Sequence, residues 1–273
     1  MIKLSEEEAY LHPKCYARGH GSCSRKISKE HFISENLLRQ MELNGTVKIG
    51  GLACQASEQF NIFGIKHKNL APKILCEYHN SVLSPLDKTM GEFFEIIGNF
   101  DRATSPSSQN PISEQKEFSG GEIEKWMLKC LLGMTVSGSL KEPTHLKPEC
   151  LDILFDTMNW PKGWGLYFKS SDQFYYHSSS FLIETRINPA DGLILAAEFY
   201  IRGLPFMLCM GKPDNPESFG IQHRPKKILF KTHTCEKVIG LTWLASCGEG
   251  IVLSRAGSYD GSPPNWKEWE KDG

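Results

Sequence analysis

The stretch Leu75-Cys76-Glu77-Tyr78-His79-Asn80-Ser81-Val82-Leu83-Ser84-Pro85-Leu86-Asp87 decides how the chain is organised. It contains the spacing of a metal-ligand pair, Cys76-x-x-His79, followed directly by Asn80. The preceding Lys73-Ile74-Leu75 is short and apolar enough for a strand. Ser84 and Pro85 suit a helix N-cap and a first helical position. We therefore expect a strand that ends on one ligand, turns through the second and leads into a helix from Pro85.

A structural zinc site needs four ligands, so a second pair must lie elsewhere in the chain. The glycine-rich segment Cys15-Tyr16-Ala17-Arg18-Gly19-His20-Gly21-Ser22-Cys23 supplies it. We take Cys15 and Cys23 as the partners of Cys76 and His79, because thiolates are strong zinc ligands. The spacing also allows His20 in place of Cys15, and Cys54 is a further candidate.

Between the two pairs, Ser28-Lys29-Glu30-His31-Phe32-Ile33-Ser34 places an acidic residue beside a histidine, in a predicted strand over Ile27–Ile33. Together with Asn69 and Cys76-x-x-His79-Asn80, this pattern resembles the HNH endonuclease (ββα-metal) domain family, in an uncharacterised bacterial subgroup. The resemblance covers about the first third of the chain. The sequence departs from the commonest pattern by Glu for Asp, by Asn for the last His, and by a long insertion.

The resemblance implies an endonuclease that hydrolyses phosphodiester bonds of nucleic acid, with DNA as the expected substrate. It assigns His31 as general base and Glu30 and Asn80 as ligands of one catalytic Mg²⁺ or Mn²⁺, with Asn69 orienting the site. The two replaced positions still offer oxygen ligands for a hard cation. A place in bacterial defence or mobile-element biology is compatible with such a protein.

The charge balance gives weak support to a nucleic-acid binder, because the formal net charge is −1. A local basic face can still contact phosphates. Candidate nucleic-acid contacts surround the two ligand pairs: Arg18, Arg25, Lys26, Lys29 and Lys73. The nine cysteines follow no secretory leader, and no apolar run reaches membrane-spanning length, so we expect a cytoplasmic protein with no membrane contact.

The composition predicts an α+β protein in two parts. The resemblance implies that residues 1–101 form an HNH-like zinc domain with a helical insertion. The Ser-, Pro- and Asn-rich residues 102–118 are expected to form a linker, and residues 119–273 a mixed domain of unknown role, open to a protein partner. Ser119 and Glu122 form a capping-box pattern that opens a helix, with Lys125 and Lys129 expected on its outer side. Antiparallel strands are expected over 166–168, 174–177, 181–187, 193–201, 205–210 and 228–231.

One alternative from another functional class remains. The zinc site could stabilise a non-catalytic module that binds nucleic acid or protein. Both hypotheses predict zinc, and only the nuclease requires Glu30, His31 and Asn80 to converge on a second cation. Asp87, in the first turn of the helix predicted from Pro85, is explained by the helix dipole without any metal.

Overall fold

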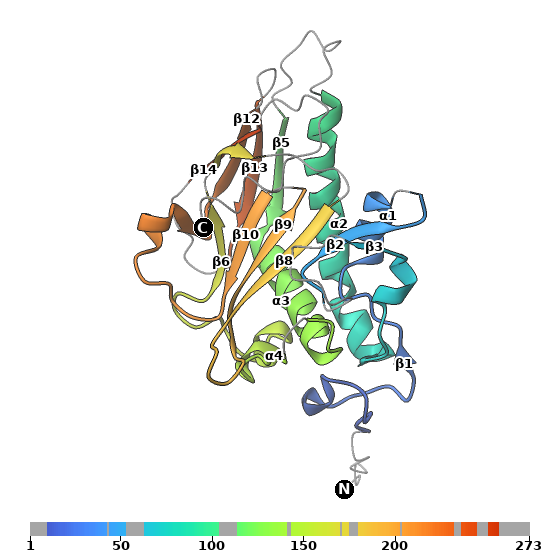
Figure 1. Ribbon diagram of the computed structural model, residues 1–273. Coiled ribbons are helices and arrows are strands. Elements are labelled where there is room, and N and C mark those ends of the chain that lie inside the picture. Colours follow the sequence, from blue (N-terminus) through green and yellow to red (C-terminus); the bar gives the residue numbers. More distant parts are fainter. Residues whose placement is uncertain are drawn as a thin grey trace, which may run out of the picture.

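The computed structural model describes the chain over residues 10–42, 44–52, 63–103, 114–140, 143–169, 171–174, 180–202, 204–231, 236–244 and 251–256. Helices and strands are mixed along it, which confirms the α+β class. Figure 1 shows two sheets with the long helices α2 and α3 beside them. The N-terminal segment with β1 lies at the lower end of the view.

The larger sheet has seven strands in the order β11-β6-β10-β9-β8-β2-β3. Its neighbours are antiparallel except for β8 and β2, which run parallel. The strand bounds are β2 Val47–Gly50, β3 Phe63–Ile65, β6 Gly165–Lys169, β8 Ser180–Ile187, β9 Ile194–Ile201, β10 Leu204–Cys209 and β11 Ile221–His223. Most of the predicted C-terminal strands are therefore confirmed. The register Ile201↔Leu204 shows a tight β9–β10 hairpin at Arg202, which has the positive φ of 51° that such turns require.

The smaller sheet has five strands in the order β5-β13-β12-β14-β7. Their bounds are β5 Glu114–Ser119, β7 Ser171–Phe174, β12 Lys227–Lys231, β13 Glu236–Thr242 and β14 Ile251–Ala256. Only the β12–β13 pair is antiparallel, and the other neighbours are parallel. The predicted strand over 174–177 meets the structure only at Phe174, because residues 175–179 lie outside the described residues.

Helices connect the two sheets. Their bounds are α1 Glu35–Met41, α2 Glu77–Ala103, α3 Gly120–Val136 and α4 Glu149–Leu154, with short 3-10 turns η1 Arg18–His20, η2 His67–Leu70 and η3 Pro216–Phe219. Phe93 of α2 packs edge-on against Phe118 of β5 and Phe206 of β10, so one aromatic side chain touches both sheets. Helix α3 contacts α2, α4, β10 and β13 and is buried on nearly all sides.

Two local predictions are wrong. Helix α2 begins at Glu77, so Cys76-x-x-His79 runs into its first turn and Pro85 lies inside it. The ring of Pro85 has no N–H for the carbonyl of Ser81, and the Ser84 hydroxyl donates to that oxygen instead, at 2.9 Å. The predicted strand Ile27–Ile33 is reduced to β1 Ile27–Ser28, which pairs with β4 Leu75–Cys76.

The two predicted parts of the chain contribute strands to one sheet. Strands β2 and β3 come from residues 1–101 but extend the sheet built by residues 165–223, because β2 pairs with β8 in the register Ile49↔Phe181. One buried cluster contains side chains from both parts. The expected linker is regular at both ends, since α2 reaches Ala103 and β5 starts at Glu114, while residues 104–113 lie outside the described residues. The described parts share one core.

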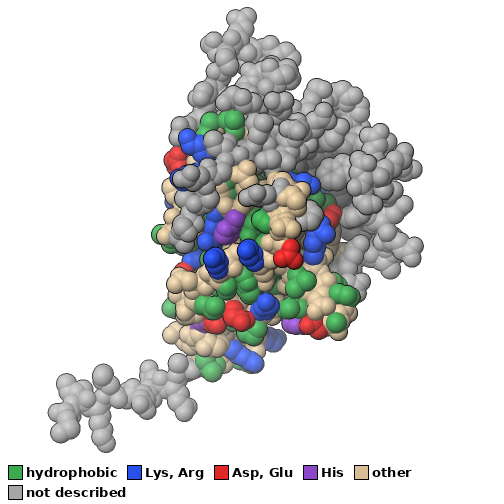
Figure 2. Space-filling view, turned by 90° about the vertical axis from the view of Figure 1, so that its left-hand side faces the viewer, with side chains coloured by type: hydrophobic (Ala, Val, Ile, Leu, Met, Phe, Trp, Pro, Cys, Tyr) green, Lys and Arg blue, Asp and Glu red, His purple; other side chains and the backbone are tan. Residues whose placement is uncertain are grey.

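Within the described ranges, no helix combines the length and apolar character needed to cross a membrane. Figure 2 shows a face on which basic, acidic and hydrophobic side chains are interspersed, so this face carries no continuous basic field for nucleic acid. Basic side chains that could bind phosphates must therefore be sought elsewhere, near the two ligand pairs.

Candidate metal centre

Three elements bring the predicted zinc ligands together. Cys15 and Cys23 lie on either side of the turn η1, Cys76 ends β4, and His79 lies in the first turn of α2. The loop is fastened to β4 because the Tyr16 N–H donates to the carbonyl of Ile74 at 3.0 Å. Cys76 directly precedes α2, and His79 follows three residues later in the first turn of the helix, where its Nδ1 lies 3.1 Å from the Cys76 sulfur. The four side chains form a buried group whose ligand atoms lie within 4.8 Å of one another.

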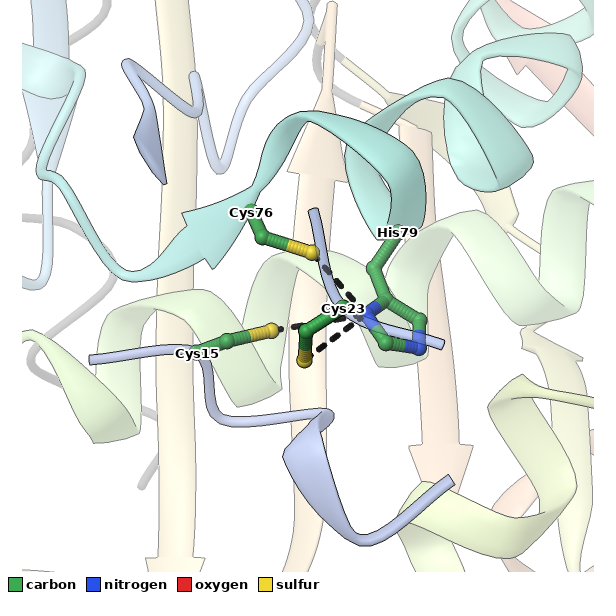
Figure 3. Close-up of side chains that lie close together, drawn as sticks. All are labelled: Cys15, Cys23, Cys76 and His79. Atoms are coloured by element: carbon green, nitrogen blue, oxygen red, sulfur yellow. Dashed lines mark hydrogen bonds between the residues drawn. The ribbon is translucent and has the colours of Figure 1, made fainter. Parts of the chain in front are cut away.

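The geometry of this group fits a tetrahedral zinc ion. The Nδ1 atom of His79 lies 3.5 Å from the sulfur of Cys15, 3.7 Å from that of Cys23 and 3.1 Å from that of Cys76 (Figure 3). Tetrahedral zinc with Zn–S of about 2.3 Å and Zn–N of about 2.05 Å sets S···N separations of about 3.6 Å. Two of the three distances match this value and the third is somewhat shorter, so the Cys15/Cys23/Cys76/His79 group could hold a zinc ion.

The protonation states of the ligands depend on their burial. Burial raises the pKa of the Cys15 thiol to about 12, so this thiol needs a cation nearby to ionise. Burial also acts to raise the pKa of Cys76, but hydrogen bonds from the His79 and Ser24 backbones outweigh it and the pKa is lowered. Burial lowers the pKa of His79, which keeps its imidazole neutral, as a metal ligand must be.

The structure resolves which residue completes the group. Cys15 belongs to it, whereas His20 turns towards α4: its Nε2 lies 3.6 Å from the carboxylate of Asp152, and its ring lies 5.0 Å from that of Phe155. Phe155 also touches the edge of the His79 ring, at 5.3 Å between centroids. Cys54 lies outside the described residues. The end of α4 therefore covers the metal-ligand group with an aromatic ring.

Glu30, predicted as a ligand of Mg²⁺ or Mn²⁺, has another partner. Its carboxylate Oε1 lies 2.6 Å from the ammonium of Lys129, which also contacts Asp87 at 2.7 Å. Asp87 accepts two further hydrogen bonds, from the Ser34 hydroxyl at 2.5 Å and the Trp126 indole at 3.1 Å. Because the ammonium occupies the space beside the carboxylate, Glu30 does not fit a Mg²⁺ or Mn²⁺ site in this arrangement, and we derive no step through such an ion.

This buried ion network holds distant elements together. Lys129 of α3 is 1% exposed, and its side chain joins Glu30, after β1, to Asp87 of α2. Burial raises the pKa of Glu30, although the Lys129 charge acts to lower it. Burial acts to lower the pKa of Lys129, but its two carboxylate partners outweigh burial and raise it, so the ammonium stays charged. The network corrects the expectation that Lys129 lies on the outer side of its helix.

The other predicted site residues lie between positions 18 and 80 of the chain. His31 is half-buried and follows Glu30, whose backbone N–H donates to the carbonyl of Pro72 at 3.0 Å. Asn80 is half-buried in the first turn of α2, and Asn69 is exposed in η2. The predicted nucleic-acid contacts are all exposed: Arg18, Arg25, Lys26, Lys29 and Lys73. Lys29 and Lys73 belong to the two chain segments that pair through β1 and β4.

The sequence prediction missed Lys129, Ser34 and Trp126 as partners in the ion network. A signal existed for Lys129, since its place three residues after Trp126 puts it on the apolar side of α3. A buried lysine requires a paired carboxylate. The identity of that carboxylate could not be read from the helix, because Glu30 lies 99 positions earlier in the chain.

Comparisons with known proteins add nothing to this geometry: no family model, no curated protein and no solved structure matches the chain.

Proposed function

We propose that this protein is an endonuclease of the HNH (ββα-metal) class that cleaves nucleic acid, with DNA as its substrate, and that zinc bound by Cys15, Cys23, Cys76 and His79 holds its active region in shape. One observation carries the proposal. Strands β1 and β4 pair antiparallel, with Ile27 opposite Cys76, and β4 continues directly into α2. This strand–strand–helix unit carries Cys76, His79 and Asn80, and His31 follows its first strand by three residues.

His31 is the proposed general base. A neutral imidazole can take a proton from water near physiological pH, which turns water into a nucleophile for the phosphodiester. His31 follows a residue that the buried ion network anchors, since Glu30 is paired with Lys129. In this proposal Glu30 is a positioning residue and not a metal ligand, because its carboxylate is engaged by the ammonium.

Exposed cations next to His31 can bind the substrate phosphate. Lys29 and Lys73 are exposed and lie on the paired segments that flank Glu30 and His31. A lysine ammonium neutralises phosphate charge and attracts nucleic acid in a salt-dependent way. Asn80 offers an amide to the same substrate from the start of α2.

The test is a cleavage assay on plasmid DNA with added Mg²⁺ or Mn²⁺ and, in a second arm, without either ion. Wild-type protein should cut, and His31→Ala should lose about 10²- to 10⁴-fold in rate while keeping zinc and fold, since this is the range that base catalysis contributes. Lys29→Gln is the control for binding. It should bind DNA more weakly, and its cleavage should still depend on His31 as in the wild type. Equal cleavage by His31→Ala and wild type would refute the mechanism.

A second function is favoured by one specific observation. The ammonium of Lys129 lies against Glu30, the acidic residue that the HNH resemblance assigns to the cation. A zinc-stabilised module that binds nucleic acid without cutting it would tolerate this ion pair. Wild-type protein that binds nucleic acid but leaves it intact in every divalent-ion arm would select this second function.

A further inference from the structure

Two tyrosine rings are exposed next to the metal-ligand group. Tyr10 is 43% exposed and Tyr78 is 49% exposed. Tyr78 lies between the ligands Cys76 and His79, and its ring meets that of His79 edge-on, at 5.2 Å between centroids. The backbone of Tyr10 is also fixed to a ligand, because its carbonyl accepts from the N–H of Cys23 at 3.1 Å. Both residues are therefore held next to the metal-ligand group, Tyr78 through its ring and Tyr10 through its backbone.

One short segment connects the two tyrosines. The Ser24 hydroxyl accepts from the backbone N–H of Tyr78 at 3.2 Å and donates to the carbonyl of Lys26 at 3.1 Å. The same Lys26 carbonyl accepts from the N–H of Glu77 at 3.0 Å. At the other side of the segment, the guanidinium of Arg25 lies 5.9 Å from the centre of the Tyr10 ring. Residues 23–26 thus run from one tyrosine to the other.

The segment between the rings is positively charged. Arg25 and Lys26 are both exposed, and Arg18 of the neighbouring loop is exposed too. One exposed carboxylate, Glu77, lies beside Lys26 among the described residues of this surface. We call Tyr10, Arg25, Lys26 and Tyr78 the tyrosine face.

We propose that the tyrosine face binds single-stranded nucleic acid, with bases stacked on the two rings and phosphates on Arg25 and Lys26. An exposed ring can stack only on a base that is itself unstacked, so the aromatic contacts select single strands over duplex. The cations complement the phosphate backbone and make binding dependent on salt. Val82, which is exposed one turn after Tyr78, extends the apolar surface along α2. This inference rests on the proposed function and adds to it a binding site for unpaired strand.

The test is fluorescence anisotropy of a labelled oligothymidylate with the full chain loaded with zinc and without added Mg²⁺. Tyr10→Ala and Tyr78→Ala should each weaken binding about 5- to 150-fold, the range for loss of one stacked base. Tyr78→Phe keeps the ring and should bind like wild type. Leu195→Ala, which removes a comparably exposed apolar side chain from β9, is the matched control and should change nothing.

Salt dependence gives an independent readout. Lys26→Gln should lower the slope of log K against log salt by about 0.7, the value for one phosphate contact with a single strand. Zinc content and circular dichroism of each variant show whether the fold is kept. Wild-type affinity in both tyrosine-to-alanine variants would overturn the proposal, as would duplex bound as tightly as the oligothymidylate.

The outcome can be separated from that of the nuclease proposal, because binding is measured on the His31→Ala background as well. A protein that binds the oligothymidylate through the tyrosines but cuts nothing supports the tyrosine face and refutes the nuclease. A protein that cuts DNA equally well with and without both rings supports the nuclease and refutes the tyrosine face.

Discussion

Replacing Lys129 by methionine tests the buried ion network directly. Lys129 is 1% exposed, and the Glu30 side chain that it neutralises is 4% exposed, so the variant leaves a carboxylate without its cation inside the protein. Breaking a buried pair by removing one partner typically costs about 3–5 kcal/mol of unfolding free energy. Asp87 is affected less, because it is 28% exposed and keeps its bonds to Ser34 and Trp126. We expect Lys129→Met to lower the free energy of unfolding by an amount in that range at pH 7.

A matched control is available one turn earlier on the same helix. Lys125 pairs with Asp156, whose side chain is largely exposed, so Lys125→Met should cost about 0–1 kcal/mol. The double variant Glu30→Gln/Lys129→Met removes the whole pair and should be less destabilised than Lys129→Met alone, since no buried charge is left. Urea unfolding, followed by the fluorescence of Trp126 and the other tryptophans, measures all of these variants.

The pH dependence of the Lys129→Met cost has a definite sign. The folded-state pKa of Glu30 is raised, so its contribution to stability is fully present below the unfolded value and is lost as pH rises through the folded pKa. Lys129 acts to lower that pKa, so its removal raises it further and widens the window in which Glu30 is neutral. The cost of Lys129→Met should therefore be smaller at pH 5 than at pH 7. A Lys129→Met cost equal to that of Lys125→Met, or one that grows on acidification, would refute this account.

Two other variants test the fold. Cys76→Ser should lose bound zinc and unfold the segment around it, because zinc contributes about 10 kcal/mol or more in small zinc modules. Metal analysis checks this, with Cys130→Ser as a control that should keep zinc, since Cys130 is buried but outside the ligand group. Ser119→Ala should cost about 0.5–2 kcal/mol in urea unfolding, because the Ser119 hydroxyl accepts from the Glu122 N–H at 3.2 Å at the start of α3. An unchanged midpoint would show that this cap is replaced by another acceptor.

The sequence made the zinc ligands predictable because their identity depends on residue chemistry and short spacing. Cys76 and His79 are three apart, and thiolates are favoured over other ligands, so the four residues that the structure brings together could be chosen without it. The start of α2 was less predictable. Serine followed by proline usually opens a helix, but here the Ser84 hydroxyl compensates for the missing N–H of Pro85 within the helix. A local pattern cannot distinguish these two uses of the same residues.

Features that depend on contacts between segments far apart in the chain could not be predicted from the sequence. Lys129 is buried because Glu30 and Asp87 meet it from two other segments, and helical periodicity reports only on the helix that carries it. The residues of strand β5 were expected to belong to a linker, because residues 102–118 are rich in Ser, Pro and Asn. It forms as an edge strand, where a parallel neighbour, β13, provides its hydrogen bonds and little apolar surface is needed.

The parallel pairing of β2 with β8 has a consequence for synthesis on the ribosome. Gly50 lies opposite Leu182, so the two strands emerge 132 residues apart. At about 5–20 residues per second, β2 is made roughly 7–26 s before its partner exists. During this interval the edge of β2 that will bind β8 is open to other chains. Lys48, exposed in the middle of this four-residue strand, places a charge on it, which is one of the ways in which proteins discourage such contacts.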